Sequence, residues 1–134
     1  MKNINRVVTN LFLVIIAPVA TILFTSGYAA AQKNDQYIRL AKIKVDGSQL
    51  ESYKHALEEG IRTAVQVEPG VITLYAMYDK NDPTNITVFE VYASVDAYRA
   101  HIETPHFKKY KNTTAKMVKS LELTDVLPIA FETK

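Results

Sequence analysis

The sequence contains no cysteine and no tryptophan, and only four of its 134 residues are glycine. Without cysteine the chain cannot form disulfides, thiolate nucleophiles, thiolate metal sites or iron–sulfur clusters. The few glycines form neither a phosphate-binding loop nor a nucleophile elbow. These absences leave histidines and carboxylates as the main candidates for chemistry.

The first thirty-one residues have the composition of a secretory signal peptide. Residues 1–6 carry two cations, residues 7–24 are nearly all apolar, and Ala29-Ala30-Ala31 supplies small residues for cleavage before Gln32. We therefore predict a signal peptide over 1–31, one domain over 32–134, and a secreted or periplasmic protein without a stable membrane anchor. Because the apolar run is just long enough to span a bilayer, an uncleaved anchor through residues 7–24 is the alternative.

The predicted mature domain has no charge excess. Lys2 and Arg6 lie in the leader, so its removal leaves equal numbers of basic and acidic residues. A formal charge of zero gives no reason to expect nucleic acid or an anionic membrane surface as partner.

The periodicity of apolar residues predicts the order β-α-β-β-α-β. Strands are expected at 37–45, 71–78, 86–93 and 121–129. Helices are expected from the cap at Ser48 to the turn at 68–70, at 94–102 and at 105–119. Ser48 and Glu51 have capping-box spacing, and Thr104-Pro105 is typical of a helix start. The order is that of a ferredoxin-like α+β fold, one antiparallel sheet with helices on one face.

The sheet face without helices needs cover in so small a domain. Val88 and Tyr92 in the third strand predict that a second copy of the chain buries this face.

Two of the three histidines, His101 and His106, lie on either side of the Thr104-Pro105 break. A neutral imidazole both donates and accepts a proton, so the pair suggests proton handling or ligand orientation. The alternative for each is a hydrogen-bonded surface or helix-end residue. Because the break separates the two rings and no carboxylate stands at ligand spacing, the sequence predicts no metal site.

The segment Glu90-Val-Tyr-x-Ser-x-x-Ala-Tyr-x-x-His-x-x-Thr-Pro-His-Phe107, preceded by Glu68-Pro-Gly-x-x-x-Leu-Tyr75, resembles the antibiotic biosynthesis monooxygenase family. Within that family the chain is most similar to the small quinol monooxygenases, over residues 37 to about 129. The resemblance implies a dimeric α/β barrel: a homodimer with sheets back to back and a ligand cavity between each sheet and its helices. It also implies oxidation of a small aromatic quinol by O2 with no cofactor, because a deprotonated hydroquinone can itself give an electron to dioxygen.

Haem-degrading members of the family carry an asparagine on the first strand, a tryptophan on the short helix and an iron-binding histidine on the next helix. Ala41, His101 and Lys111 stand at the matching positions here. These departures argue against haem breakdown.

The resemblance assigns roles to six residues, and a seventh candidate for the substrate site, Glu90, stands out as the odd residue in an otherwise apolar strand. His101 and His106 are expected as base and hydrogen-bond partner, Phe107 and Tyr110 as cavity wall, and Tyr75 and Tyr92 as aromatics facing the substrate or the dimer partner. Glu90 is either a buried carboxylate with a raised pKa or one half of an ion pair with Arg39 across the sheet. Two other functions stay open: a non-catalytic small-molecule-binding or stress-response module, and an isomerase of a small carbonyl compound.

Overall fold

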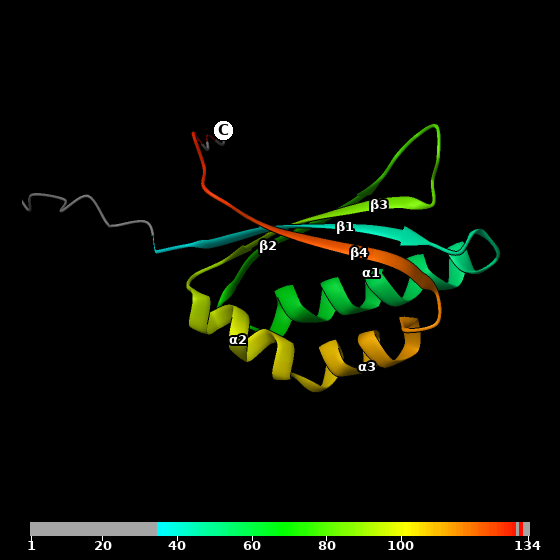
Figure 1. Cartoon of the computed structure of the whole chain (residues 1–134). Coiled ribbons are helices and arrows are strands. Elements are labelled where there is room, and N and C mark those ends of the chain that lie inside the picture. The colour runs from blue at the N-terminus through cyan, green and yellow to red at the C-terminus, as the bar shows by residue number, and fades with distance from the viewer. Residues whose placement is uncertain (1–34, 131, 133–134) are drawn as a thin grey trace, which may run out of the picture. The chain divides into compact units, whose positions relative to one another are not determined.

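The computed structural model describes residues 35–130 and 132 (Figure 1). The predicted signal peptide over 1–31, and the alternative anchor over 7–24, lie outside the described residues. Within the described part no helix is both long and apolar enough to cross a membrane.

The described residues form four strands, three α-helices and a short 3-10 turn. The elements in chain order are β1 (Tyr37–Val45), η1 (Gly47–Gln49), α1 (Leu50–Val67), β2 (Val71–Tyr78), β3 (Asn85–Tyr92), α2 (Val95–Glu103), α3 (Pro105–Thr114) and β4 (Val118–Val126). The strands pair antiparallel in the order β2-β3-β1-β4, and the helices lie together on one face of the sheet (Figure 1). The predicted ferredoxin-like α+β fold is confirmed.

The starts of α2 and α3 follow the local signals in the sequence. The Ser94 hydroxyl accepts the Ala97 backbone N–H at 3.1 Å, and the Thr104 hydroxyl accepts that of Phe107 at 3.3 Å. Pro105 occupies the first turn of α3, where its missing N–H costs nothing. The break between the two helices therefore lies where the sequence predicts it.

Three details of the prediction are wrong. Asp46, not Ser48, caps the turn before α1, because its carboxylate accepts the Ser48 backbone N–H at 2.9 Å. The last helix ends at Thr114 rather than near residue 119, because the following residues turn and Val118 pairs with Val45 of β1. Strand β4 accordingly runs over Val118–Val126 and not over the predicted 121–129.

The core lies between the helices and the sheet, in two clusters. The larger holds the fully buried Tyr53 of α1 against Ile43 and Val88, and the smaller joins Ala64 of α1 to Tyr92. Val88 and Tyr92 therefore face the helices, which corrects their expected place on the open face. Because side chains alternate along a strand, that open face carries the intervening residue Phe89.

Candidate functional site

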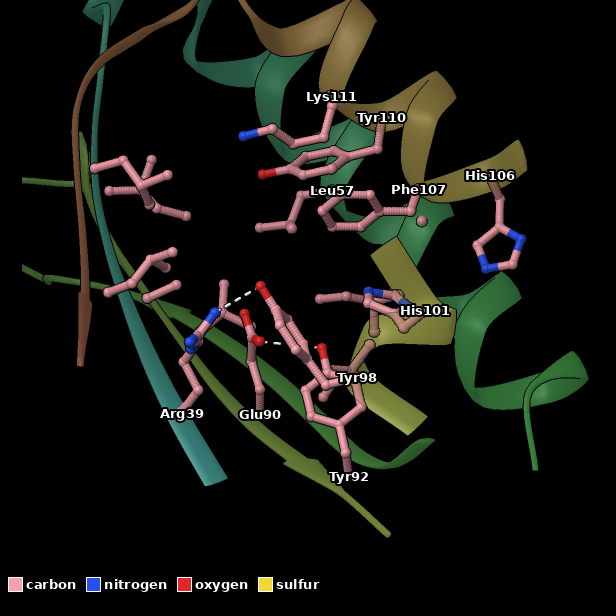
Figure 2. Close-up of a pocket in the computed structure, with 18 of the residues that line it drawn as sticks. Arg39, Leu57, Glu90, Tyr92, Tyr98, His101, His106, Phe107, Tyr110 and Lys111 are labelled. Atoms are coloured by element: carbon pink, nitrogen blue, oxygen red, sulfur yellow. Dashed lines mark hydrogen bonds between the residues drawn. The ribbon is translucent and has the colours of Figure 1, made fainter. Parts of the chain in front are cut away.

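A cavity of about 110 Å³ lies between the helices and the sheet (Figure 2). Its wall is mostly apolar and aromatic, with polar groups at the sheet side and at the ends of the helices. The residues used below that line it are Arg39, Leu57, Glu90, Tyr92, Tyr98, His101, His106, Phe107, Tyr110, Lys111, Leu121 and Leu123. Leu121 and Leu123 of β4 are themselves about half exposed, so this strand borders the side open to solvent.

A set of polar side chains that we call the sheet cluster consists of Tyr37, Arg39, Asp125 and Tyr98. Arg39 donates from Nε to Asp125 at 2.8 Å and from its guanidinium to the Tyr98 hydroxyl at 2.6 Å. Its guanidinium also lies over the Tyr98 ring, 4.5 Å from the centroid. Burial, and then the hydrogen bond that its hydroxyl donates to Asp125, raise the pKa of Tyr37 to about 12. The cluster therefore fixes the charged guanidinium of Arg39 at the edge of the cavity.

Glu90 presents a carboxylate beside this cluster. It lies directly across from Arg39 in the β1–β3 register, but Arg39 forms its ion pair with Asp125 on the other neighbouring strand. The Tyr92 hydroxyl donates to Glu90 Oε2 at 3.0 Å. Burial raises the pKa of Glu90, opposed by the Tyr92 hydrogen bond and the charge of Arg39. Of the two alternatives for Glu90, the structure therefore has the carboxyl of raised pKa, here with a hydroxyl partner, and not the ion pair with Arg39.

His101 lies in the last turn of α2 and is only 6% exposed. Its ring packs between aromatic neighbours, with the Phe107 centroid at 4.8 Å and the Tyr92 centroid at 5.4 Å. Ring atom Nδ1 lies 2.9 Å from Oε1 of Glu68, the residue that ends α1. Packing and this contact together hold the imidazole in one orientation.

His106 contacts the same carboxylate oxygen. Its Nε2 lies 2.5 Å from Glu68 Oε1 and 3.2 Å from the Thr104 hydroxyl, which itself donates to the His101 carbonyl at 2.7 Å. We call Glu68, His101 and His106 the helix-end cluster, because the three residues come from the end of α1, the end of α2 and the start of α3.

The helix-end cluster determines where the proton of His101 lies. An ionised carboxylate only accepts hydrogen bonds, so the nitrogens that contact ionised Glu68 carry the N–H. In a neutral His101 ring the lone pair is then on Nε2, and among the described residues nothing donates to that atom. His101 can therefore accept a proton from a molecule in the cavity it lines.

Gly70 sets how closely α2 approaches the turn that carries Glu68. A Cβ at Gly70 would lie 2.6 Å from Cβ of Ala97, a distance at which real side chains must shift. The Glu68-Pro-Gly sequence thus supplies both a carboxylate and the close approach that brings His101 to it.

Tyr110 of α3 lines the cavity and pairs with the buried Tyr53 behind it. The Tyr53 and Tyr110 hydroxyls lie 2.7 Å apart, and burial raises the pKa of both phenols. Tyr110 therefore serves as a neutral wall residue at physiological pH.

Six of the seven residues expected at the site line the cavity: Glu90, Tyr92, His101, His106, Phe107 and Tyr110. Tyr75 does not, because it lies on the opposite face of the sheet with 63% of its surface exposed. The sequence analysis did not predict Glu68 and Tyr98 as site residues. Both lie in the two segments that carry the family resemblance, Glu68 in the first and Tyr98 in the second. Lys111, placed by analogy with the haem-degrading branch, also borders the cavity.

The model of the antibiotic biosynthesis monooxygenase family matches residues 36–113. The chain belongs to this family. The match covers both polar clusters except Asp125, which lies in β4 beyond the matched residues.

Solved structures agree with this assignment. A candidate antibiotic biosynthesis monooxygenase from Bacteroides thetaiotaomicron is 43% identical, with a TM-score of 0.73 over 75% of this chain and 97% of that one. A candidate monooxygenase from Lactobacillus acidophilus is 30% identical, with a TM-score of 0.69 over 71% of this chain and 45% of that one, so the present chain spans about half its length. A Nitrosomonas europaea protein with a similar name is 20% identical and shows the shared fold, with a TM-score of 0.68 over 72% of this chain and 93% of that one. No curated protein matches the sequence.

Proposed function

We propose that this protein is a cofactor-independent monooxygenase that oxidises a quinol or a related phenol with O2. The observation that carries the proposal is the orientation of His101. Glu68 contacts Nδ1, so Nε2 is available to a molecule in the largely apolar cavity that His101 lines.

The proposed reaction needs only substrate and dioxygen. One oxygen atom replaces a hydrogen on the ring, the other leaves as water, and the quinol supplies all four electrons as it becomes a hydroxyquinone. The step that needs a protein group is removal of a phenolic proton, after which the quinolate can reduce O2. A positioned histidine base contributes about 10²–10⁴-fold to such a step.

The cavity suits a small aromatic substrate. Its volume of about 110 Å³ approaches that of an engineered apolar cavity, about 150 Å³, that binds benzene. Phe107, Tyr110 and Leu57 would hold the ring. Figure 2 shows Arg39 and Glu90 on the sheet side and His101 on the helix side, so polar partners exist for oxygens at both ends of a quinol.

Oxygen consumption with a panel of hydroquinones and flavonoid-like phenols tests the proposal. We expect quinol-dependent O2 uptake, and we expect His101→Ala to lower kcat/KM by about 10²–10⁴-fold. His55→Ala is the matched control, because His55 is an exposed residue of α1 that does not line the cavity. Uptake at the normal rate in His101→Ala would remove this residue from the mechanism. A copurifying aromatic ligand without any O2 uptake would favour the non-catalytic binding module.

A second candidate, isomerisation of a small carbonyl compound, is favoured by one observation. Glu90 offers a carboxyl of raised pKa within a set of polar groups that includes Arg39 and Tyr98. Exchange of carbon-bound hydrogen of a carbonyl substrate with deuterated water, in the absence of O2, would identify this activity.

We also propose that the protein is a homodimer joined through the open sheet face. Leu40, Phe89 and Tyr75 lie side by side across β1, β3 and β2 on that face. Tyr75 and Met77 are exposed in the single chain. Light scattering should give twice the chain mass, and Tyr75→Lys should lower it toward one chain.

Export remains a proposal that rests on the composition of residues 1–31. N-terminal sequencing of the protein recovered from the producing cell should begin at Gln32. Recovery of an intact N-terminus in the membrane fraction would instead favour the anchor.

A further inference from the structure

The geometry points to a binding site for one divalent transition-metal ion, best suited to Zn²⁺, at the helix-end cluster of Glu68, His101 and His106. The sequence predicted no metal site, because Pro105 separates the two histidines and no carboxylate stands near them. The fold brings Glu68 to both rings from residues far away in the chain.

The three ligand atoms already lie close together. Glu68 Oε1, His101 Nδ1 and His106 Nε2 are all within 4.8 Å of one another. Bonds of about 2.0–2.1 Å to a tetrahedral ion separate the ligand atoms by about 3.3 Å. The 2.9 and 2.5 Å contacts of Glu68 would therefore lengthen by about 0.4 and 0.8 Å, which is within reach of small side-chain rotations.

The donor set selects the class of ion. Two imidazoles and one carboxylate are ligands of zinc and other first-row transition metals, whereas magnesium and calcium prefer all-oxygen shells. Three protein ligands leave a fourth position for water. In the number and type of its protein ligands, the site resembles open zinc sites, which keep one position for water, and not closed structural sites with four protein ligands.

Charge also favours a cation. The Glu68 side chain is 12% exposed, and its partners are the two imidazoles. Among the described residues no lysine or arginine forms an ion pair with it. A carboxylate withdrawn from water requires compensation, which a divalent ion would supply.

One member of the cluster, His106, also borders a groove on the helix side. A groove between α1 and α3, with a volume of about 70 Å³, is lined by His106 together with Glu59 and Lys109. Glu59 and Lys109 form an ion pair with each other 2.5 Å apart, so they border the groove without occupying the cluster. His106 is therefore bordered by this groove as well as by the substrate cavity.

Metal at this site would alter the substrate cavity through His101. A neutral imidazole that binds metal through Nδ1 carries its proton on Nε2. Nε2, the nitrogen available to a molecule in the cavity, would then donate rather than accept a proton. Zinc is therefore expected to inhibit proton removal, a consequence that depends on the proposed function, whereas the metal site itself does not.

The test is metal binding by the tag-free full chain after treatment with a chelator. Calorimetric titration with Zn²⁺ should give one ion per chain, and Co²⁺ should give the visible absorption of a four-coordinate site. Glu68→Gln and His106→Ala should each weaken binding at least about tenfold. His55→Ala and Glu59→Gln should bind as wild type, because one removes an exposed histidine and the other a groove carboxylate outside the cluster.

Three outcomes would overturn the proposal. They are no binding by the wild-type chain, unchanged binding in folded Glu68→Gln, and loss of binding in His55→Ala. Circular dichroism of each variant confirms folding. Zinc binding without inhibition of O2 uptake would leave the metal site intact and remove His101 as the base. Quinol-dependent O2 uptake in a chain that binds no zinc would support the proposed function and exclude the metal site.

Discussion

The helix-end cluster and the sheet cluster lie near one cavity but are built in different ways. The sheet cluster has Tyr37, Arg39 and Asp125 on paired strands, where the register fixes which side chains are neighbours. The helix-end cluster draws each member from the end of a different helix. Its geometry therefore depends on the two turns at Pro69-Gly70 and Thr104-Pro105.

The strand residues of the sheet cluster are therefore held more rigidly than the residues of the helix-end cluster. Backbone ladders hold the strands that carry Arg39 and Asp125 on both sides of β1. The helix-end residues are held by contacts between side chains and by the packing of α2 on the turn after α1. We expect mutations at the helix ends to disturb the helix-end cluster without moving the strand members of the sheet cluster, whereas Tyr98 lies on α2 and would move with that helix.

Gly70→Ala should have the largest effect. The new methyl group would meet Ala97 of α2 at 2.6 Å, so α2 must move or strain. Overpacking of this kind costs about 1–3 kcal/mol of unfolding free energy. Urea denaturation measures the loss, with Gly47→Ala as control, because its Cβ would meet a Thr84 methyl group at an ordinary 3.7 Å. Equal losses in the two variants would show that α2 packing does not depend on Gly70.

Glu68→Gln should lower activity with little change in fold. The amide keeps the shape of the carboxylate but can present an N–H to one of the rings, so the His101 ring loses its fixed proton position. Outer partners that orient metal-bound histidines contribute about 10–100-fold, and we expect an effect of that size here. We expect the loss in kcat for quinol oxidation with a nearly unchanged KM and Tm, and no loss in Glu59→Gln. A change confined to Tm would mean that Glu68 acts only in the fold.

Glu90→Gln should have the smallest effect and a characteristic pH dependence. Burial raises the pKa of Glu90 above its ordinary value of 4.5, so the folded chain holds this proton at a pH where the unfolded chain has released it. The contribution of Glu90 to stability therefore declines as pH rises through that window. Gln can still accept the Tyr92 hydroxyl, and it carries no charge to bury.

Thermal melts of Glu90→Gln and wild type across pH 4–8 test this point. The variant should gain stability relative to wild type as pH rises, by a few degrees in Tm at most. A difference independent of pH would show that Glu90 titrates alike in the folded and unfolded chains.

The sequence predicted much of the frame because its signals are local. The alternation in residues 37–45 and the Thr104-Pro105 break each depend on a few neighbouring residues, and both appear where expected. The end of α3 was misplaced because Met117 and Leu121 continue a helical spacing, whereas pairing of Val118 with β1 decides the structure. Tertiary pairing there overrides periodicity.

The site was predicted less completely because its contacts are long-range. Glu68 meets His101 and His106 only after three helix ends converge, and no spacing in the sequence encodes that approach. Arg39 has an acidic residue across from it on each side, Glu90 on β3 and Asp125 on β4. The choice of Asp125 depends on a strand pairing that the sequence does not reveal.

Strand β1 pairs along its length with β4, from Ile38 opposite Val126 to Val45 opposite Val118. During translation the first strand therefore emerges long before its partner, and the sheet stays incomplete until β4 has been synthesised. Pairings so distant in sequence slow folding. Because Leu121 and Leu123 come with this last strand, a nascent chain that stops short of it lacks one wall of its binding chamber. Capture of a ligand would thus report that β4 has joined the sheet.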